Sequence, residues 1–361
     1  RDGGLVNNFE FEDDFVKNLY TANVASGVDY MEFGYKASKE IFDVKEFGKW
    51  KFCDEDDIRA VVGDNNTDMK IAVMADVGRT DYKKDILPKK DSVIDMIRIA
   101  TYVNTIPAAI EMINYCADMG YETTINIMAI SSAAEDELDI ALNLLSKSKV
   151  NVIYLVDSYG SLYPEQIRRY ADKYLKIGEK TGKLVGIHAH NNQQLAFANT
   201  IEACAIGVSY LDATMGGMGR GAGNCYMELL LGFLRNPKYN INPVLRFLQN
   251  RIVPLKKNGV VWGCDVQYML TGQRNQHPRA AIEFTNQKRE DYIDFYRKVF
   301  QDYKEPLFWI HLNMDYPFNM KGILYFPKIN MEYESIEGTI KLYNNQVFIA
   351  DNIKEVIPEF L

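Results

Sequence analysis

The sequence has 361 residues, of which 47% are hydrophobic, and its formal net charge at pH 7 is -8. A chain of this length can bury a sizeable core, in one large domain or two smaller ones. The acidic balance argues against a nucleic-acid partner, and no apolar run approaches the roughly 18 residues that cross a bilayer. We therefore expect a cytoplasmic protein with no membrane partner. The five cysteines have no CxxC spacing, so neither a zinc knuckle nor a disulfide framework is predicted.

The chain alternates between strand-like and helix-like hydrophobic spacing. We expect short, mostly apolar strands at residues 28–34, 70–76, 96–100, 122–129, 150–157, 184–190 and 210–214. We expect helices at residues 13–26, 55–62, 105–119, 135–147, 164–179, 193–206 and 226–234. Two of these helices have a proline in the first turn, at Pro107 and Pro164, where a missing N–H group is tolerated.

Such strand–helix units predict a parallel sheet covered by helices. A doubly wound open sheet is the alternative, but no GxGxxG motif follows any strand. The sustained spacing of about 30 residues per unit favours a (β/α)8 TIM barrel. The sequence opens without Met at Arg1, so we expect the first strand of the barrel to be missing ahead of it. Residues 244–255 and 261–274 predict a short helical extension after the barrel.

The apolar run that begins at Leu184 ends in His188 and His190, which are separated by one residue. Side chains alternate faces in an extended segment, so the two imidazoles point the same way and reach one common point. Converging imidazoles indicate a divalent-metal site. The alternative interpretation is a pair of histidines that are hydrogen-bonded at a strand end, and the spacing by itself leaves both open.

Polar residues mark the ends of the predicted strands, where a TIM barrel carries its chemistry. These residues are Arg1, Asp2, Glu32, Asp76, Thr101, Asn126, Asp157, Ser158, His188, His190 and Thr214. Some of them are expected only to satisfy the backbone of the following loops. The loop at residues 215–224 contains five glycines and ends at Asn224. It suits either a lid that closes on a ligand or a plain flexible connection.

Three motifs follow one another along the chain: Arg1-Asp2-Gly3, the histidine motif at 188–192, and the glycine loop that ends at Asn224. Together they resemble the DRE-TIM, or HMGL-like, metallolyases over residues 1 to about 283. Arg1-Asp2-Gly3-Gly4 and the segment 156–160 are similar to the 4-hydroxy-2-oxovalerate aldolase branch. The resemblance implies a homodimeric, metal-dependent aldolase or lyase. Its substrate would be a 2-oxo acid or 4-hydroxy-2-oxo acid, cleaved through a metal-stabilised enolate.

The same resemblance implies roles for single residues. The ligands of a Mn²⁺ or Mg²⁺ ion would be Asp2, His188, His190 and Asn224. Arg1 would place positive charge beside the oxyanion that develops on the substrate. Glu32 and Asp157, also at strand ends, would orient ligands or shuttle a proton.

The sequence also departs from the family pattern. The aldolases have a histidine as general base two residues beyond the Gly of the Arg-Asp-Gly motif, and this sequence has Leu5 there. The glycine loop has Gly217 and Met218 in the region of the cysteine of HMG-CoA lyase. Candidates for the missing base are Tyr159, Glu32 and His277. A Claisen-type synthase that joins an acyl-CoA to a 2-oxo acid, or a non-catalytic interaction protein, therefore stays an alternative.

The C-terminal part resembles a different family. The segments 291–296, 305–307, 322–327, 340–352 and 357–361 are similar to the first part of the middle domain of bacterial Hsp90 chaperones. This stretch lacks the ATP-binding domain, so we expect no chaperone ATPase activity and interpret the chain as a fusion or composite. The predicted domains are a barrel at 1–240, a helical extension at 241–288 and an Hsp90-like α+β segment at 289–361.

Overall fold

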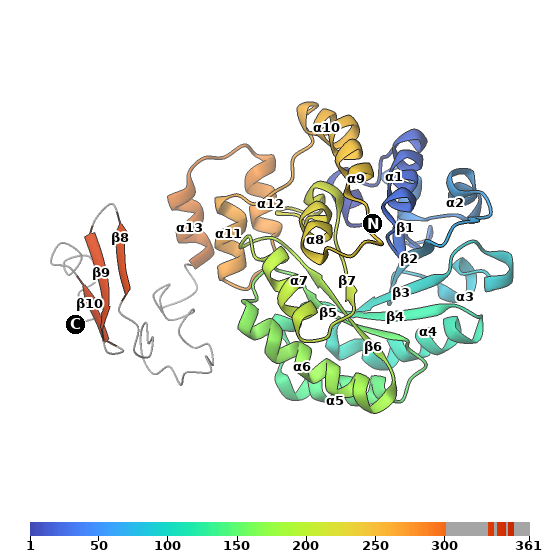
Figure 1. Ribbon diagram of the computed structural model, residues 1–361, viewed down its shortest axis with the longest axis horizontal. Coiled ribbons are helices and arrows are strands. Elements are labelled where there is room, and N and C mark those ends of the chain that lie inside the picture. Colours follow the sequence, from blue (N-terminus) through green and yellow to red (C-terminus); the bar gives the residue numbers. More distant parts are fainter. Residues whose placement is uncertain (301–330, 336–337, 344–345, 350–361) are drawn as a thin grey trace. The chain divides into compact units, whose positions relative to one another are not determined.

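The structure, a computed structural model, describes residues 1–300, 331–335, 338–343 and 346–349 (Figure 1). It divides into two compact units, Arg1–Tyr292 and Ile293–Leu361. The three-domain division predicted from the sequence stays a prediction. Every helix among the described residues is too short or too polar to span a bilayer.

The first unit contains seven strands and a series of helices. The strands are β1 (Tyr30–Tyr35), β2 (Lys70–Asp76), β3 (Met96–Thr101), β4 (Glu122–Ile127), β5 (Val152–Asp157), β6 (Leu184–Ala189) and β7 (Tyr210–Leu211). The helices that alternate with them, beginning ahead of β1, are α1 (Asp13–Ser26), α2 (Glu55–Val62), α3 (Tyr82–Asp85), α4 (Ile106–Asp118), α5 (Glu135–Ser146), α6 (Pro164–Thr181), α7 (Ala196–Ala205) and α8 (Met227–Leu234). The extension after the barrel comprises α9 (Ile241–Phe247), α10 (Val253–Lys257), α11 (Val266–Gln273) and α12 (Arg279–Asn286).

The seven strands form one parallel sheet in the order of the sequence, from β1 to β7. Strand order does not reverse, as it would at the switch point of a doubly wound sheet. The sheet curls, and helices follow its strands, so the unit has the predicted TIM-barrel-like fold (Figure 1). β3 and β5 are buried along their whole length, which explains why they read as apolar runs.

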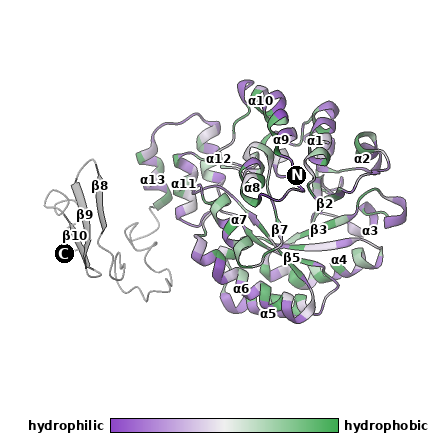
Figure 2. Ribbon diagram, viewed as in Figure 1, coloured by the Kyte–Doolittle hydropathy of each residue, from purple (hydrophilic) through white to green (hydrophobic). Residues whose placement is uncertain are grey.

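Hydrophobic side chains fill the space between sheet and helices. The largest cluster of buried apolar residues takes Ile71 and Val73 from β2, Ile97 and Ile99 from β3, and Ile125 from β4. The helices expose their polar faces, and Figure 2 shows many hydrophilic residues along α5 and α6. Because the strands are parallel, their carboxyl ends lie together at one end of the barrel.

The end of the sheet differs from the sequence prediction. β7 was expected at 210–214 but pairs with β6 only through Tyr210 and Leu211. Thr214 instead forms a bridge with Tyr226, and His190 lies one residue beyond β6 in a bridge with Asn224. The backbone of Thr214 and His190 thus pairs with residues in and just after the glycine loop, and the pairing between β6 and β7 ends early.

A cavity of about 590 Å³ lies beside β1 and β7 and is lined by Tyr30, Tyr210 and Asp212 among others. The hydroxyl groups of Tyr30 and Tyr210 are 3.3 Å apart, so the two end strands approach each other. The strand expected ahead of Arg1 stays a prediction.

The second unit contains an antiparallel sheet with the order β10-β9-β8. Its strands are β8 (Met331–Ser335), β9 (Gly338–Tyr343) and β10 (Gln346–Ile349). The sequence has strand-like apolar runs at 322–326 and 346–349. β10 confirms the second, and the first lies outside the described residues. A further helix, α13 (Tyr292–Phe300), begins at the last residue of the first unit.

Candidate metal centre

Three potential metal ligands meet at the carboxyl end of the sheet. Asp2, His188 and His190 each offer a donor atom, and these atoms all lie within 4.8 Å of one another. All three side chains are buried. His188 is in β6 and His190 just beyond it, while Asp2 begins a short 3-10 helix, Asp2–Val6. The backbone nitrogen of Arg1 donates to the carbonyl of Glu32 at 3.1 Å, which attaches this segment to β1.

Each histidine is oriented by a hydrogen bond at its Nδ1 atom. Nδ1 of His188 lies 2.9 Å from Oδ2 of Asp212, and Nδ1 of His190 lies 3.0 Å from the carbonyl oxygen of Asp157. These contacts leave both Nε2 atoms for the common point. His190 Nε2 lies 3.4 Å from Asp2, and His188 Nε2 is buried with no hydrogen-bond partner among the described residues. Metal-binding histidines have this arrangement: the ring nitrogen that does not bind the metal donates its N–H to a carboxylate or a backbone carbonyl.

Asn224 completes the cluster from the glycine loop. Its Nδ2 atom donates to Oδ2 of Asp2 at 2.7 Å, and its Oδ1 atom is buried without a partner in the described part of the chain. Two unsatisfied buried acceptors beside a carboxylate and a second imidazole fit a divalent cation, because a cation would satisfy both. The residues present therefore fit the metal that the sequence predicts.

The protonation states also suit a cation. Burial opposes the ionisation of Asp2, but Arg1, His190 and His188 together outweigh it and hold the pKa of this carboxyl well below its ordinary value. Burial lowers the pKa of His190, so its ring is neutral at pH 7. A carboxylate and neutral imidazoles are the forms that bind metals.

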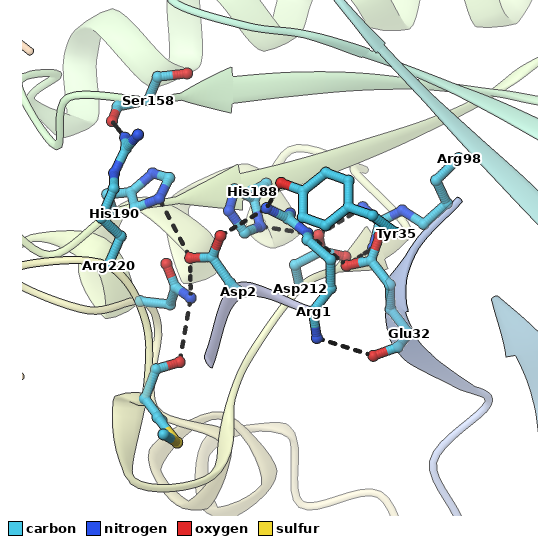
Figure 3. A network of polar contacts seen from close by, with 12 residues as sticks. Arg1, Asp2, Glu32, Tyr35, Arg98, Ser158, His188, His190, Asp212 and Arg220 are labelled. Carbon is cyan, nitrogen blue, oxygen red and sulfur yellow. Dashed lines mark hydrogen bonds and ion pairs between the residues drawn. The ribbon is translucent and has the colours of Figure 1, made fainter. Parts of the chain in front are cut away.

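A chain of ion pairs supports the cluster (Figure 3). Arg1 is 2.6 Å from Asp2 and 3.0 Å from Glu32. Arg98 is 3.3 Å from Glu32 and 2.6 Å from Asp212, the residue that orients His188. Positive and negative side chains alternate along this chain, so each buried charge has an opposite neighbour.

The sequence prediction did not include Arg98 or Asp212. A usable signal existed for Arg98, because an arginine in the middle of an apolar strand must be buried and paired. Asp212 stands directly after β7, whereas the predicted strand at 210–214 places it inside the strand.

Glu32 and Asp157, the two residues predicted to orient ligands or shuttle a proton, have different surroundings. Burial raises the pKa of Glu32, but Arg1 and Arg98 outweigh it, so the carboxylate stays ionised in its ion pairs. The carboxylate of Asp157 accepts the backbone N–H groups of Ser161 at 3.0 Å and Leu162 at 3.2 Å. It faces a loop, and only its carbonyl reaches His190. A catalytic role for either residue stays a prediction.

The glycine loop is packed scaffold in this structure. The carbonyl of Gly216 accepts from the indole of Trp262 at 3.0 Å, and the carbonyl of Gly223 accepts from the backbone of Asn191 at 2.8 Å. A Cβ atom on Gly219 would lie 2.5 Å from Nδ2 of Asn224 and 2.9 Å from Oδ2 of Asp2. This close approach explains a glycine at this position: the loop presses Asn224 against Asp2.

A small cavity opens on the cluster. Its volume is about 90 Å³, and its lining includes Asp2, His188 and His190 together with Leu5, Tyr159, Arg220 and His277. Leu5, at the position where the aldolases have their general base, thus lines the cavity. Two of the candidate bases, Tyr159 and His277, also line it.

Replacing Asp212 tests whether its hydrogen bond to Nδ1 of His188 supports metal binding. Asp212→Asn should weaken Mn²⁺ binding about 10- to 100-fold, because the amide no longer fixes the imidazole as a carboxylate does. Isothermal titration calorimetry of the purified wild type and variant with Mn²⁺ measures this change in affinity. Asp118→Asn, which alters an exposed pair with Lys149, serves as the control. Unchanged affinity in Asp212→Asn would refute the role given to Asp212.

Comparison with known proteins agrees with this geometry. Residues 1–249 match the HMGL-like family. The oxaloacetate decarboxylase of Mycobacterium tuberculosis is 30% identical over 239 residues, which are 65% of this chain and 68% of that protein. The 4-hydroxy-2-oxovalerate aldolase of Geobacillus genomosp. 3 is 30% identical over 152 residues, which are 42% of this chain and 44% of that protein.

Solved structures show the same fold. The N-terminal domain of a proposed aldolase from Bacteroides vulgatus superposes with a TM-score of 0.69 at 29% identity, covering 79% of this chain and 94% of that one. The HMG-CoA lyase of Bacillus subtilis gives a TM-score of 0.56 at 13% identity, covering 71% and 91% of the two chains. At 13% identity, the likeness to the HMG-CoA lyase shows a shared fold and no more.

The C-terminal part has other relatives. Residues 275–361 match the Hsp90 protein family. The chaperone protein HtpG of Porphyromonas gingivalis is 48% identical over 85 residues, which are 24% of this chain but 12% of that chaperone. The chain thus spans a small part of the chaperones that it matches. By its larger match the chain belongs to the HMGL-like family, whose aldolase and decarboxylase relatives support an enzyme of the metal-dependent lyase class.

Proposed function

We propose that this protein is a divalent-metal carbon–carbon lyase that cleaves a 4-hydroxy-2-oxo acid or a related 2-oxo acid and releases pyruvate or a similar keto acid. The observation that carries the proposal is the buried Asp2, His188 and His190 cluster, in which His188 Nε2 lacks a partner among the described residues. The cavity of about 90 Å³ that opens on it suits a small molecule. Mn²⁺ or Mg²⁺ is the proposed metal on the family resemblance, and the mixed nitrogen and oxygen donors are compatible with Mn²⁺.

The residues around the cluster would divide the work. Asp2, His188, His190 and Asn224 would hold the metal, which would act as a Lewis acid on the substrate carbonyl. Arg1 is fixed by Asp2 and Glu32 and keeps a positive charge beside the oxyanion that develops. Losing such a charge typically costs about 3 kcal/mol of transition-state stabilisation.

Two polar side chains that line the cavity, Tyr159 and His277, are neutral. Burial lowers the pKa of His277 to about 4 and raises the pKa of Tyr159. Both side chains are therefore uncharged at pH 7 and act as hydrogen-bond partners of the substrate in this proposal. A homodimer and a cytoplasmic location are also proposed, on the family resemblance and the composition respectively.

The proposal predicts metal-dependent release of pyruvate. The Mn²⁺-loaded protein should release pyruvate from 4-hydroxy-2-oxovalerate, with the rate followed by NADH oxidation in the presence of lactate dehydrogenase. EDTA should abolish the activity and added Mn²⁺ should restore it, because the bound metal would supply the Lewis acid that polarises the carbonyl. The double variant His188→Ala/His190→Ala, checked for folding by circular dichroism, should be inactive.

Three outcomes would contradict the proposal. Pyruvate release that survives complete metal removal would exclude the metal-dependent mechanism. Release of free thiol from acetyl-CoA and a 2-oxo acid, without cleavage of hydroxy-oxo acids, would identify a Claisen-type synthase instead. Partner binding that is unchanged in the double histidine variant, without any turnover, would support a non-catalytic interaction protein.

A further inference from the structure

Arg220 is a cation in the substrate cavity that has no carboxylate partner among the described residues. Its Nη2 atom donates to the carbonyl oxygen of Ser158 at 3.2 Å, and its Nη1 atom lies 3.2 Å from Nε2 of His277. Its Nε atom is buried without a hydrogen-bond partner in the described part of the chain. The other two arginines of the site, Arg1 and Arg98, are each paired with two carboxylates. Arg220 thus brings uncompensated positive charge to the cavity.

The contact between Arg220 and His277 also suits an anion. Nδ1 of His277 accepts the backbone N–H of Arg279 at 3.1 Å. A neutral imidazole with an accepting Nδ1 carries its proton on Nε2. In that tautomer Nε2 is a second N–H donor, 3.2 Å from Nη1 of Arg220. A carboxylate that enters the cavity would accept from both groups.

Contacts at Ser158 and His277 position the guanidinium of Arg220, and its neighbours are closely packed. Its neighbour Gly221 has φ +58°, and a Cβ atom there would lie 2.8 Å from the ring of Tyr268. The ring of Tyr159 lies 6.0 Å from that of His277 and covers its side. Figure 3 shows Arg220 beside His190, with its guanidinium turned to Ser158. The same cavity therefore presents the metal cluster and a fixed cationic group.

We propose that Arg220 and His277 bind a second carboxylate of the substrate, so that the preferred substrates are 4-hydroxy-2-oxo dicarboxylates. This inference rests on the proposed function, which places the 2-oxo acid end of the substrate at the metal cluster. The second carboxylate belongs on C4, the carbon that becomes the carbonyl of the leaving product. A carboxylate that left as CO₂ would have to lose its charge, and a cation beside it would oppose that step.

The reaction is a balanced retro-aldol cleavage. In 4-hydroxy-2-oxoglutarate the C3–C4 bond breaks, and its electron pair moves into the C2–C3 bond to give the enolate of pyruvate. The hydroxyl on C4 loses its proton and becomes the carbonyl of glyoxylate. The enolate takes up a proton at C3. No oxidant or reductant is consumed, and the glyoxylate carboxylate keeps its contact with Arg220.

Matched pairs of ligands test the inference. 4-Hydroxy-2-oxovalerate and 4-hydroxy-2-oxoglutarate differ by a methyl against a carboxylate on C4, and both release pyruvate. The wild type should prefer the dicarboxylate by roughly 10- to 100-fold in kcat/KM, as expected for a hydrogen-bonded charge pair. Arg220→Gln should abolish this preference, mainly through KM. Arg168→Gln, at an exposed pair with Glu202, should retain it.

A binding measurement gives a readout without turnover. 2-Oxoglutarate and 2-oxovalerate have the same carbon chain and lack the 4-hydroxyl group that cleavage requires. Calorimetry with the Mn²⁺-loaded protein should show tighter binding of 2-oxoglutarate, by roughly 10- to 100-fold, in the wild type and in Arg168→Gln. Arg220→Gln should lose this difference. His277→Phe, which keeps an aromatic ring beside Tyr159, should reduce it and covers the case in which Arg220→Gln does not fold.

The outcomes separate the two proposals. If the wild type cleaves or binds 2-oxo acids without preferring the dicarboxylate, the role of Arg220 is overturned and the lyase assignment stands. If the preference persists in both Arg220→Gln and His277→Phe, the carboxylate lies elsewhere and the inference is wrong. If no 2-oxo acid is bound or cleaved by the metal-loaded wild type, the proposed function itself fails.

Discussion

Wild-type protein produced with added Mn²⁺ should retain the metal through gel filtration, whereas Asp2→Ala and His190→Ala should retain almost none. Each variant removes a donor from a cluster whose atoms lie within 4.8 Å of one another. Loss of an outer contact alone costs about 10- to 100-fold in metal affinity, so loss of a direct ligand should cost more than about 100-fold. Metal content per chain, measured by inductively coupled plasma mass spectrometry, provides the readout.

Asp76→Asn is the matched control for this experiment. Asp76 is the last residue of β2, and its side chain is 15% exposed, so it is also a largely buried carboxylate at a strand end. It is not one of the three clustered ligands and should leave the metal content near that of the wild type. Equal and negligible metal in wild type and variants would refute the metal centre.

Arg98→Met should destabilise the first unit by about 3 to 5 kcal/mol, because it leaves two buried carboxylates without their shared cation. Arg98 is buried, contacts Glu32 and Asp212, and lies with its guanidinium carbon 4.5 Å from the centre of the Tyr154 ring. Methionine preserves much of the apolar volume, so the change reports on charge more than on packing. Urea unfolding, followed by the fluorescence of the tryptophans, measures the free energy of unfolding.

Arg79→Met is the control for charge removal at the surface. The side chain of Arg79 is 65% exposed and lies 3.9 Å from Asp76. Exposed pairs of this kind contribute about 0 to 1 kcal/mol, so the unfolding midpoint should change little. If Arg98→Met were as mild as Arg79→Met, the ion-pair chain would have no part in holding the site together.

The sequence determined the barrel because hydrophobic periodicity is local. Strands buried on both faces read as apolar runs, and β3 and β5 were located almost residue for residue. The two-residue spacing of His188 and His190 was enough to predict converging rings, whose centres are 4.9 Å apart. The motif resemblance added Asp2 and Asn224, which the structure brings together at 2.7 Å.

Only the tertiary structure decided which groups support and complete the site. Arg98 and Asp212 are 114 residues apart in sequence, and Arg220 and His277 are 57 apart, yet each pair is in contact. Gly186 has a similar long-range reason: a Cβ atom there would lie 2.6 Å from the Tyr154 ring, which packs on Arg98. Such contacts depend on how the curl of the sheet brings strand ends and loops together. Local periodicity carries no record of that convergence, so it predicted the strands and the histidine pair but not their partners.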